Sequence, residues 1–144
     1  MQGVVVEYTT DPGAHPLGHE RGTRTALAER LAALKGFAFE GEFDPARRYP
    51  GPIYFVPSDT LVGAETAKRL RIRSELDLFG GVVPYAFMAT KAITHPLVEP
   101  DADAPVGWSR DFAELVKEYV LLGFTAFTHR DARRAGARLL DPVR

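Results

Sequence analysis

The segment "GVVVEYTTDPGAHPLGHERGTRTALAERLAALKGFAFEGEF", residues 3–43, alternates between patterns typical of a strand, a helix and a second strand. Residues 3–8 form a β-branched run and predict a buried strand, and the turn-forming residues after it predict a loop. Residues 37–43 alternate apolar and polar side chains and predict another strand. Two strands joined by a helical segment favour a parallel sheet with a crossover helix.

A helix is predicted between these two strands, over residues 19–36. Leu27, Leu31 and Leu34 are spaced i, i+4 and i+7, which indicates one apolar stripe facing the sheet. Gly36 supplies a C-terminal stop.

The middle of the chain repeats the alternation. Residues 53–56, "IYFV", predict a buried strand, and residues 61–71, "LVGAETAKRLR", predict a helix. Residues 79–87 predict a turn and a short strand that Pro84 ends. The N-terminal cap of the helix is expected from one of the polar residues of "PSDT", namely Ser58, Asp59 or Thr60.

The last third of the chain has helical patterns. Ser109 is a suitable N-cap for a helix that Gly123 ends, and Thr128 can cap a second helix with Asp131 in its first turn. The apolar spacing of the first helix indicates its helical character, with a stripe formed by Phe112, Leu115, Val116, Tyr119 and Val120. The inner face of the second helix is expected to be formed by Ala132, Ala135, Gly136 and Leu139. The predicted fold class is therefore α/β, with parallel strands and flanking helices followed by a mainly helical segment.

Composition excludes several classes of function. The 144 residues, 45% hydrophobic and 26% charged, fit a globular domain. The 18 basic and 19 acidic residues give no general argument for binding nucleic acid or an anionic membrane. There is no cysteine, so disulfides and thiolate chemistry are excluded. With neither a signal peptide nor a transmembrane run, we expect a cytoplasmic protein.

Ligands of open parallel sheets bind beyond the carboxyl ends of the strands, which draws attention to the loop after residue 8. His15, His19, Glu20 and Arg21 are the candidate substrate-binding residues of that loop. The spacing of the two histidines would suit a metal on a continuous helix, but Pro16 and Gly18 interrupt one, so we expect no metal site. The alternatives are a polar helix-entry loop and an anion site at a helix N-terminus.

Three other polar groups have simpler explanations. Ser58 beside Asp59 could suggest a nucleophile, but helix capping explains both residues more simply. We interpret Trp108 as a packing anchor. The basic side chains of the last helix could contact phosphates, but a solvated helix face is the simpler interpretation for Arg130, Arg133, Arg134 and Arg138.

The apolar run "VPYAFMATKAITHPL", residues 83–97, contains Lys91 and His95. On a helix these two residues would share a face and, if both were charged, would repel each other unless an anion lay between them. The alternatives are a lysine that reaches solvent and a lysine that binds phosphate as a point charge. From spacing alone we favour the first.

Four stretches resemble an uncharacterised bacterial protein family of unknown function: "GHERGTRTALAERLAAL", "IYFVPSDTLVG", "DLFGGVVPYAFMATKAITHPLV" and "GFTAFTHRDARRAGARLL". Residues 83–97 and the last of these stretches also resemble the middle of ATP-grasp proteins. That resemblance implies a Rossmann-like pre-ATP-grasp domain over residues 1–88 and the start of a nucleotide-binding subdomain over residues 89–144. In it, Lys91 matches a lysine that binds ATP phosphate.

The ATP-grasp resemblance implies an ATP-dependent carboxylate ligase that uses ATP and Mg²⁺, acts on a small-molecule carboxylate and proceeds through an acyl phosphate. The sequence departs from that pattern because Arg144 precedes the position of a second nucleotide-binding lysine and of the Mg²⁺ ligands. We therefore expect residues 1–144 alone to be inactive, and Lys91 to reach solvent. Two alternatives remain: a non-catalytic small-molecule-binding module, and an interaction domain that forms a homodimer through the helices at 109–122 and 128–140.

Overall fold

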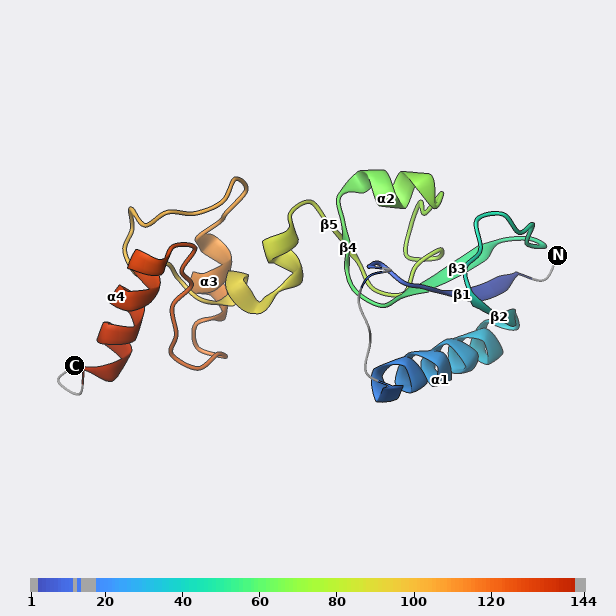
Figure 1. Ribbon diagram of the computed structural model, residues 1–144, viewed down its shortest axis with the longest axis horizontal. Coiled ribbons are helices and arrows are strands. Elements are labelled where there is room, and N and C mark those ends of the chain that lie inside the picture. Colours follow the sequence, from blue (N-terminus) through green and yellow to red (C-terminus); the bar gives the residue numbers. More distant parts are fainter. Residues whose placement is uncertain (1–2, 12, 14–17, 142–144) are drawn as a thin grey trace. The chain divides into compact units, whose positions relative to one another are not determined.

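A computed structural model describes residues 3–11, 13 and 18–141 of the chain (Figure 1). It divides into two compact units, Met1–Pro84 and Tyr85–Arg144, which are described separately below. The sequence-based division lay between residues 88 and 89. The first unit contains all the paired strands, and the second contains helices joined by irregular segments.

The first unit is built on a three-stranded parallel sheet. Its strands are β1 (Val4–Tyr8), β2 (Ala38–Glu42) and β3 (Ile53–Pro57), in the order β2-β1-β3. The central strand β1 pairs with both neighbours, Val5 lying opposite Phe39 in β2 and opposite Tyr54 in β3. The three strands predicted from the sequence and their parallel arrangement are thus confirmed, and the fold class is mixed α/β.

Helix α1 (Gly18–Lys35) connects β1 to β2 and covers one face of the sheet (Figure 1). Gly36, with φ of +65°, ends the helix in the left-handed conformation that glycine tolerates. The helix agrees with the prediction, and the predicted apolar stripe is correct in part, because Leu27 and Leu31 pack against the buried cluster. Ala28 and Ala32 are the buried residues, whereas Leu34 is 84% exposed. Small side chains let the helix backbone approach the sheet closely, and of the predicted leucine stripe only Leu34 lies outside the contact.

The opposite face of the sheet carries a second apolar cluster. Val4, Val6 and Phe55 pack there against Leu61, Leu70 and Leu78. Helix α2 (Ala64–Arg69) lies on this side, and a short parallel pair is formed by β4 (Leu61–Val62) and β5 (Val82–Val83). The predicted strand before Pro84 is therefore confirmed.

The predicted helix over residues 61–71 is wrong in its first part. Leu61 and Val62 pair with β5, so the helix begins only at Ala64, after Gly63 with φ of +79°. Ser58, Asp59 and Thr60 lie too far upstream to cap it. Strand pairing has overridden the local preference for a helix, because the tertiary partner satisfies the backbone groups of Leu61 and Val62.

The second unit begins with two 3₁₀ turns, η1 (Ala86–Ala89) and η2 (Lys91–Thr94), so residues 83–97 do not form the continuous helix that would align Lys91 with His95. Phe87, Trp108 and Phe127 form an aromatic cluster, with the Trp108 and Phe127 ring centroids 5.3 Å apart. The interpretation of Trp108 as a packing residue is confirmed.

Helix α3 (Asp111–Val116) is shorter than predicted and ends well before Gly123. The hydroxyl of Ser109 accepts a hydrogen bond from the backbone N–H of Asp111 at 3.3 Å. Ala113 is the buried residue of the helix. The prediction of a helix as far as residue 122 is therefore wrong in its second half, and several large apolar side chains of this region are exposed, among them Phe112, Leu115, Tyr119, Leu121 and Leu122.

Helix α4 (His129–Leu140) begins as predicted, because the Thr128 side chain accepts a hydrogen bond from the backbone N–H of Asp131 at 3.1 Å. The Thr128 hydroxyl donates to the Asp131 carboxylate at 2.8 Å, and Arg130 and Arg134 lie within ion-pair distance of the same carboxylate. Asp131 is fully buried. The predicted inner face is only partly correct, since Ala135 is buried whereas Ala132 and Leu139 are exposed.

The basic face of α4 is not purely solvated. Arg138 donates to the backbone carbonyl of Val98 at 2.5 Å and to the Glu99 carboxylate at 2.6 Å. Arg130 also lies 3.4 Å from Asp103. These arginines therefore join α4 to the preceding loop within the second unit.

Acid is expected to destabilise the second unit through Asp131. The hydrogen bond from Thr128, followed by the charges of Arg130 and Arg134, holds the pKa of Asp131 below its ordinary value. A lowered pKa in the folded state stabilises the fold above the unfolded pKa, and this contribution disappears as the pH falls through the folded value. The free energy of unfolding should therefore fall below about pH 4.

The fluorescence of Trp108, the one tryptophan in the chain, can follow this acid transition. Thr128→Val removes the hydroxyl donor, so its unfolding free energy should fall less steeply with acid than that of the parent chain. An identical acid dependence in both proteins would contradict the role given to Thr128.

Candidate functional site

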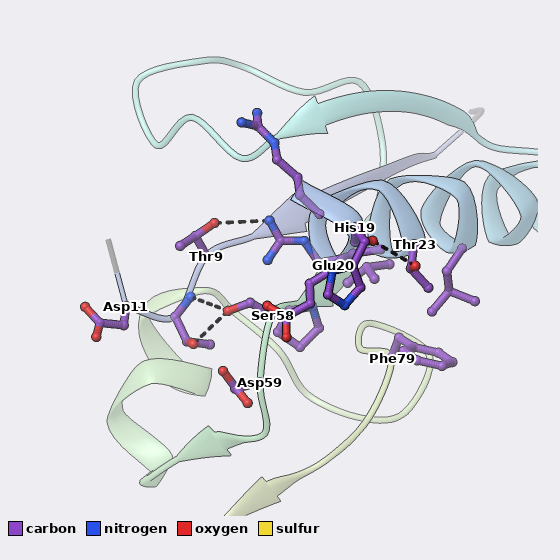
Figure 2. A pocket seen from close by; sticks show the side chains of 14 residues that line it. Thr9, Asp11, His19, Glu20, Thr23, Ser58, Asp59 and Phe79 are labelled. Atoms are coloured by element: carbon purple, nitrogen blue, oxygen red, sulfur yellow. Dashed lines mark hydrogen bonds between the residues drawn. The ribbon is translucent and has the colours of Figure 1, made fainter. Parts of the chain in front are cut away.

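A cavity of about 700 Å³ lies at the carboxyl edge of β1 and β3, beside the first turns of α1 (Figure 2). Its polar walls come from three segments of the first unit. Thr9, Thr10 and Asp11 follow β1, Ser58 and Asp59 follow β3, and the rest belong to α1. We call this space the edge cavity. It lies where ligands bind in open parallel sheets.

Hydrogen bonds hold the two strand ends together. The backbone N–H of Ser58 donates to the carbonyl of Tyr8 at 2.8 Å. The backbone N–H of Thr10 donates to the Ser58 hydroxyl at 3.1 Å, and the hydroxyls of Thr10 and Ser58 lie 2.9 Å apart (Figure 2). Ser58 thus joins the two loops rather than capping a helix. Among the described residues, it has no hydrogen bond to a histidine that could activate it as a nucleophile.

A buried ion pair lies beneath the cavity. Side chains of β1 alternate between the two faces, so Val4 and Val6 point to the α2 side while Glu7 points to α1. Glu7 is 5% exposed, and its carboxylate accepts from Arg24 Nε at 3.1 Å and from the Thr25 hydroxyl at 3.0 Å. Arg24 also lies 3.6 Å from Glu42 and 3.4 Å from the Thr9 hydroxyl. This network fixes the helix against the strand ends.

The structure brings together three of the four predicted substrate residues. His19, Glu20 and Arg21 all line the edge cavity from the first turns of α1. The backbone carbonyl of His19 accepts from the Thr23 hydroxyl at 2.9 Å (Figure 2). His15, the fourth, lies outside the described residues.

Charges of both signs surround the edge cavity. Asp11, Glu20 and Asp59 supply carboxylates, and Arg21 supplies an exposed guanidinium that pairs with no described acid. Arg24 is already paired with Glu7 and Glu42. The arrangement suits a small ligand that carries both an ammonium and a carboxylate group, because each would meet an opposite charge.

Lys91 belongs to the second unit. Its side chain is exposed and forms no ion pair with a described residue, in agreement with the expectation that it reaches solvent. The backbone around it is held firmly. The Thr94 hydroxyl donates to the Lys91 carbonyl at 2.7 Å, and the Thr125 hydroxyl donates to the Ala92 carbonyl at 2.6 Å.

Among the described residues, the side chains of His, Asp and Glu form no group of three or more that could hold a metal ion. None of the described helices has the length and apolar character needed to cross a membrane. The described part of the chain therefore offers oxygen and nitrogen groups for hydrogen bonding and charge pairing, without a metal cluster.

Comparison with protein families gives one match. The family of proteins of unknown function designated DUF3182 matches residues 5–144, nearly the whole chain. The chain belongs to the DUF3182 family. No curated protein matches it, and no solved structure does. The family match covers both units, but its description assigns no activity to either.

Sequence reasoning missed the central pair of this DUF3182 site, Glu7 and Arg24. One signal was present: Glu7 interrupts a run of valines, and a carboxylate in a buried strand needs a partner. The sequence does not identify the partner of Glu7, because any basic residue of the helix or of the loop after β2 could have been close to this carboxylate in the folded chain. The sequence did not single out Thr9, Thr10 or Asp11. It predicted only that a ligand would bind near the loop after β1.

Proposed function

We propose that this DUF3182 protein binds a small amino-carboxylate in the edge cavity, as the substrate-binding part of an ATP-dependent carboxylate ligase. The observation that carries the proposal is the position of the cavity: it lies at the carboxyl edge of parallel strands, beside the start of α1, with acidic side chains and Arg21 on its walls. The β2-β1-β3 order with a helical crossover supports a Rossmann-like pre-ATP-grasp domain for the first unit.

Each end of the ligand has its own contacts. Asp11 and Asp59 can receive the ammonium group, since both line the cavity at the strand ends. Arg21 can hold the carboxylate as a charged hydrogen-bond donor. We assign no ligand contact to the Glu7–Arg24 pair, because its two charges already neutralise each other. The pair holds the start of α1 against the strand ends.

For ATP, the fit to the described residues is limited to one contact. Lys91 is exposed, unpaired among the described residues and anchored on the rigid backbone of η2, as a phosphate ligand should be. ATP, when bound, supplies the phosphoryl group that activates the carboxylate. The described acids do not gather into a Mg²⁺ site, so we assign no ligand for that ion.

The edge cavity can be tested by calorimetric titration with a panel of amino acids, each compared with its amide and its deaminated acid. We expect binding that needs both charged groups and that weakens at least tenfold in Arg21→Ala and in Asp59→Asn. Arg30→Ala is the matched control, because Arg30 is exposed on the same helix and lies outside the cavity. Equal binding by all three variants would contradict the proposal.

The ATP contact is testable even if binding is weak. Amine-reactive labelling followed by mass spectrometry measures the modification rate of each lysine, and ATP with Mg²⁺ should slow labelling of Lys91. Lys117, which pairs with Glu114 at 2.8 Å in the same unit, is the internal control. If amino acids bind but ATP protects no lysine, the chain is a binding module without ligase chemistry.

A further inference from the structure

A second and larger cavity, of about 1550 Å³, lies on the sheet face that α1 does not cover. Its walls come from the end of β1, the first turns of α1, the segment from the end of β2 to the start of β3, and the C-terminal end of α2. Thr9, Thr10, Arg21 and Arg24 line both cavities, so the two meet at the carboxyl end of β1. We call the second space the arginine cavity.

The described residues that line this cavity include six arginines and a single acid, Glu42. The arginines come in pairs from three separate segments: Arg21 and Arg24, Arg47 and Arg48, Arg69 and Arg71. The chain as a whole has 18 basic and 19 acidic residues. The concentration of positive charge is therefore local to this cavity and does not follow from composition.

Half of these arginines are already engaged. Arg24 pairs with Glu7, Arg47 lies 2.6 Å from Glu40, and Arg69 donates to the Tyr8 hydroxyl at 3.1 Å.

The other half, Arg21, Arg48 and Arg71, are exposed and form no ion pair with a described residue. Guanidinium groups that share a cavity repel one another, and a multiply charged anion would relieve this repulsion.

The backbone conformation of Arg71 is unusual for a residue other than glycine. Arg71 has φ of +59° and is the only described residue other than glycine with a positive φ. It ends α2: its backbone N–H donates to the Lys68 carbonyl at 3.0 Å, and the Ile72 N–H donates to the Ala67 carbonyl at 2.9 Å. Glycine is the residue favoured at this position of a helix end. The strain of an arginine there places a guanidinium at the cavity wall.

The floor of the arginine cavity is apolar. The rings of Phe43 and Tyr49 stack with centroids 5.7 Å apart, and Ile53 and Phe55 lie beside them. Arg47 also lies over the Tyr49 ring, 5.3 Å from its centroid. A ligand that combines an apolar or aromatic group with a phosphate would match the floor and the charged walls together.

We propose that the arginine cavity binds a phosphate ester of a small organic molecule, with the phosphate held by Arg48 and Arg71 and the organic group lying on Phe43 and Tyr49. This site adjoins the amino-carboxylate site proposed above and shares Arg21 in its wall, but the contacts proposed for its ligand line the arginine cavity alone. Arginine is suited to this ligand, because its planar group can donate two parallel hydrogen bonds to phosphate oxygens.

The test is a calorimetric titration of the whole chain with three probes: inorganic phosphate, phenyl phosphate and phenylacetate. Phenyl phosphate should bind at least tenfold more tightly than either of the others, because each of those lacks one half of the ligand. Arg48→Ala and Arg71→Gly should each weaken phenyl phosphate at least tenfold, while Arg30→Ala should leave its affinity unchanged.

Arg71→Gly also separates binding from folding. Relief of the positive φ should raise the melting temperature of this variant, so a loss of phosphate binding in it cannot come from misfolding. Arg71→Lys keeps the charge but not the paired donors and should bind with intermediate affinity.

The proposal would be overturned if the three probes bound equally, if none bound, or if Arg48→Ala and Arg71→Gly bound phenyl phosphate as the parent does. Amino-acid binding is measured independently in Asp59→Asn, whose side chain lines only the edge cavity. The two measurements are independent, so a failure of phosphate-ester binding does not decide whether amino acids bind in the edge cavity, and the reverse also holds.

Discussion

Replacing Glu7 with leucine is expected to lower the free energy of unfolding of the first unit by about 3 kcal/mol. The Glu7 carboxylate is buried and accepts hydrogen bonds from both Arg24 and Thr25. The side chain of Arg24 is only 11% exposed, so loss of Glu7 leaves a poorly solvated guanidinium. Glu42 lies 3.6 Å away and compensates in part, which keeps the expected loss near the lower end for buried pairs.

Urea denaturation followed by circular dichroism measures this loss, because the longest helix, α1, belongs to the first unit. The decisive control is the double variant Glu7→Leu/Arg24→Met. Replacing both charges by apolar side chains removes the unpaired guanidinium, and the double variant should lie within about 1 kcal/mol of the parent. A double variant as unstable as the single one would show that the pair matters through shape rather than charge.

Replacing Gly107 with alanine is expected to lower the unfolding free energy of the second unit by about 3 kcal/mol. Gly107 has φ of +85°, and a Cβ atom there would lie 2.0 Å from Cε2 of Tyr85. The Tyr85 ring would have to leave its stacked position, 5.8 Å from the Phe87 ring. Backbone strain and the loss of this aromatic contact act in the same direction.

Trp108 follows Gly107 directly and packs against Phe87, so its fluorescence reports this change in denaturation experiments. Gly136→Ala is the matched control. It makes the same chemical change inside α4, where a Cβ meets no atom within 4 Å. There the substitution should raise stability by about 1 kcal/mol, because alanine favours the helix. Similar effects of the two substitutions would contradict the proposed clash at Tyr85.

The elements best predicted from the sequence are those whose signals are local. β1 follows from a β-branched run, α1 from a periodic segment that Gly36 ends, and β2 from alternating apolar and polar residues, all within a span of about 40 residues. The start of α4 follows from Thr128 and Asp131, which satisfy each other's hydrogen bonds three residues apart. Neighbours along the chain determine these features, so they can be found without knowledge of the fold.

Predictions failed where a distant partner decides the outcome. Leu61 and Val62 had a helical pattern but pair with β5 about 20 residues later. The apolar stripe that includes Leu115 and Tyr119 predicted a helix as far as residue 122, yet α3 ends at Val116 and both side chains are exposed. An amphipathic segment gains most of its helical stability from packing, and the sequence does not say whether a packing partner exists.

The sequence by itself determined the strand–helix–strand unit and its parallel sheet, and it drew attention to His19, Glu20 and Arg21, which the structure places in the first turns of α1 rather than in a loop. Only the tertiary structure paired Glu7 with Arg24 and gathered Arg21, Arg48 and Arg71 around one cavity. The reason is geometric. Secondary structure depends on hydrogen bonds and side chains a few residues apart, whereas a site forms where strand ends and loops from distant parts of the chain meet.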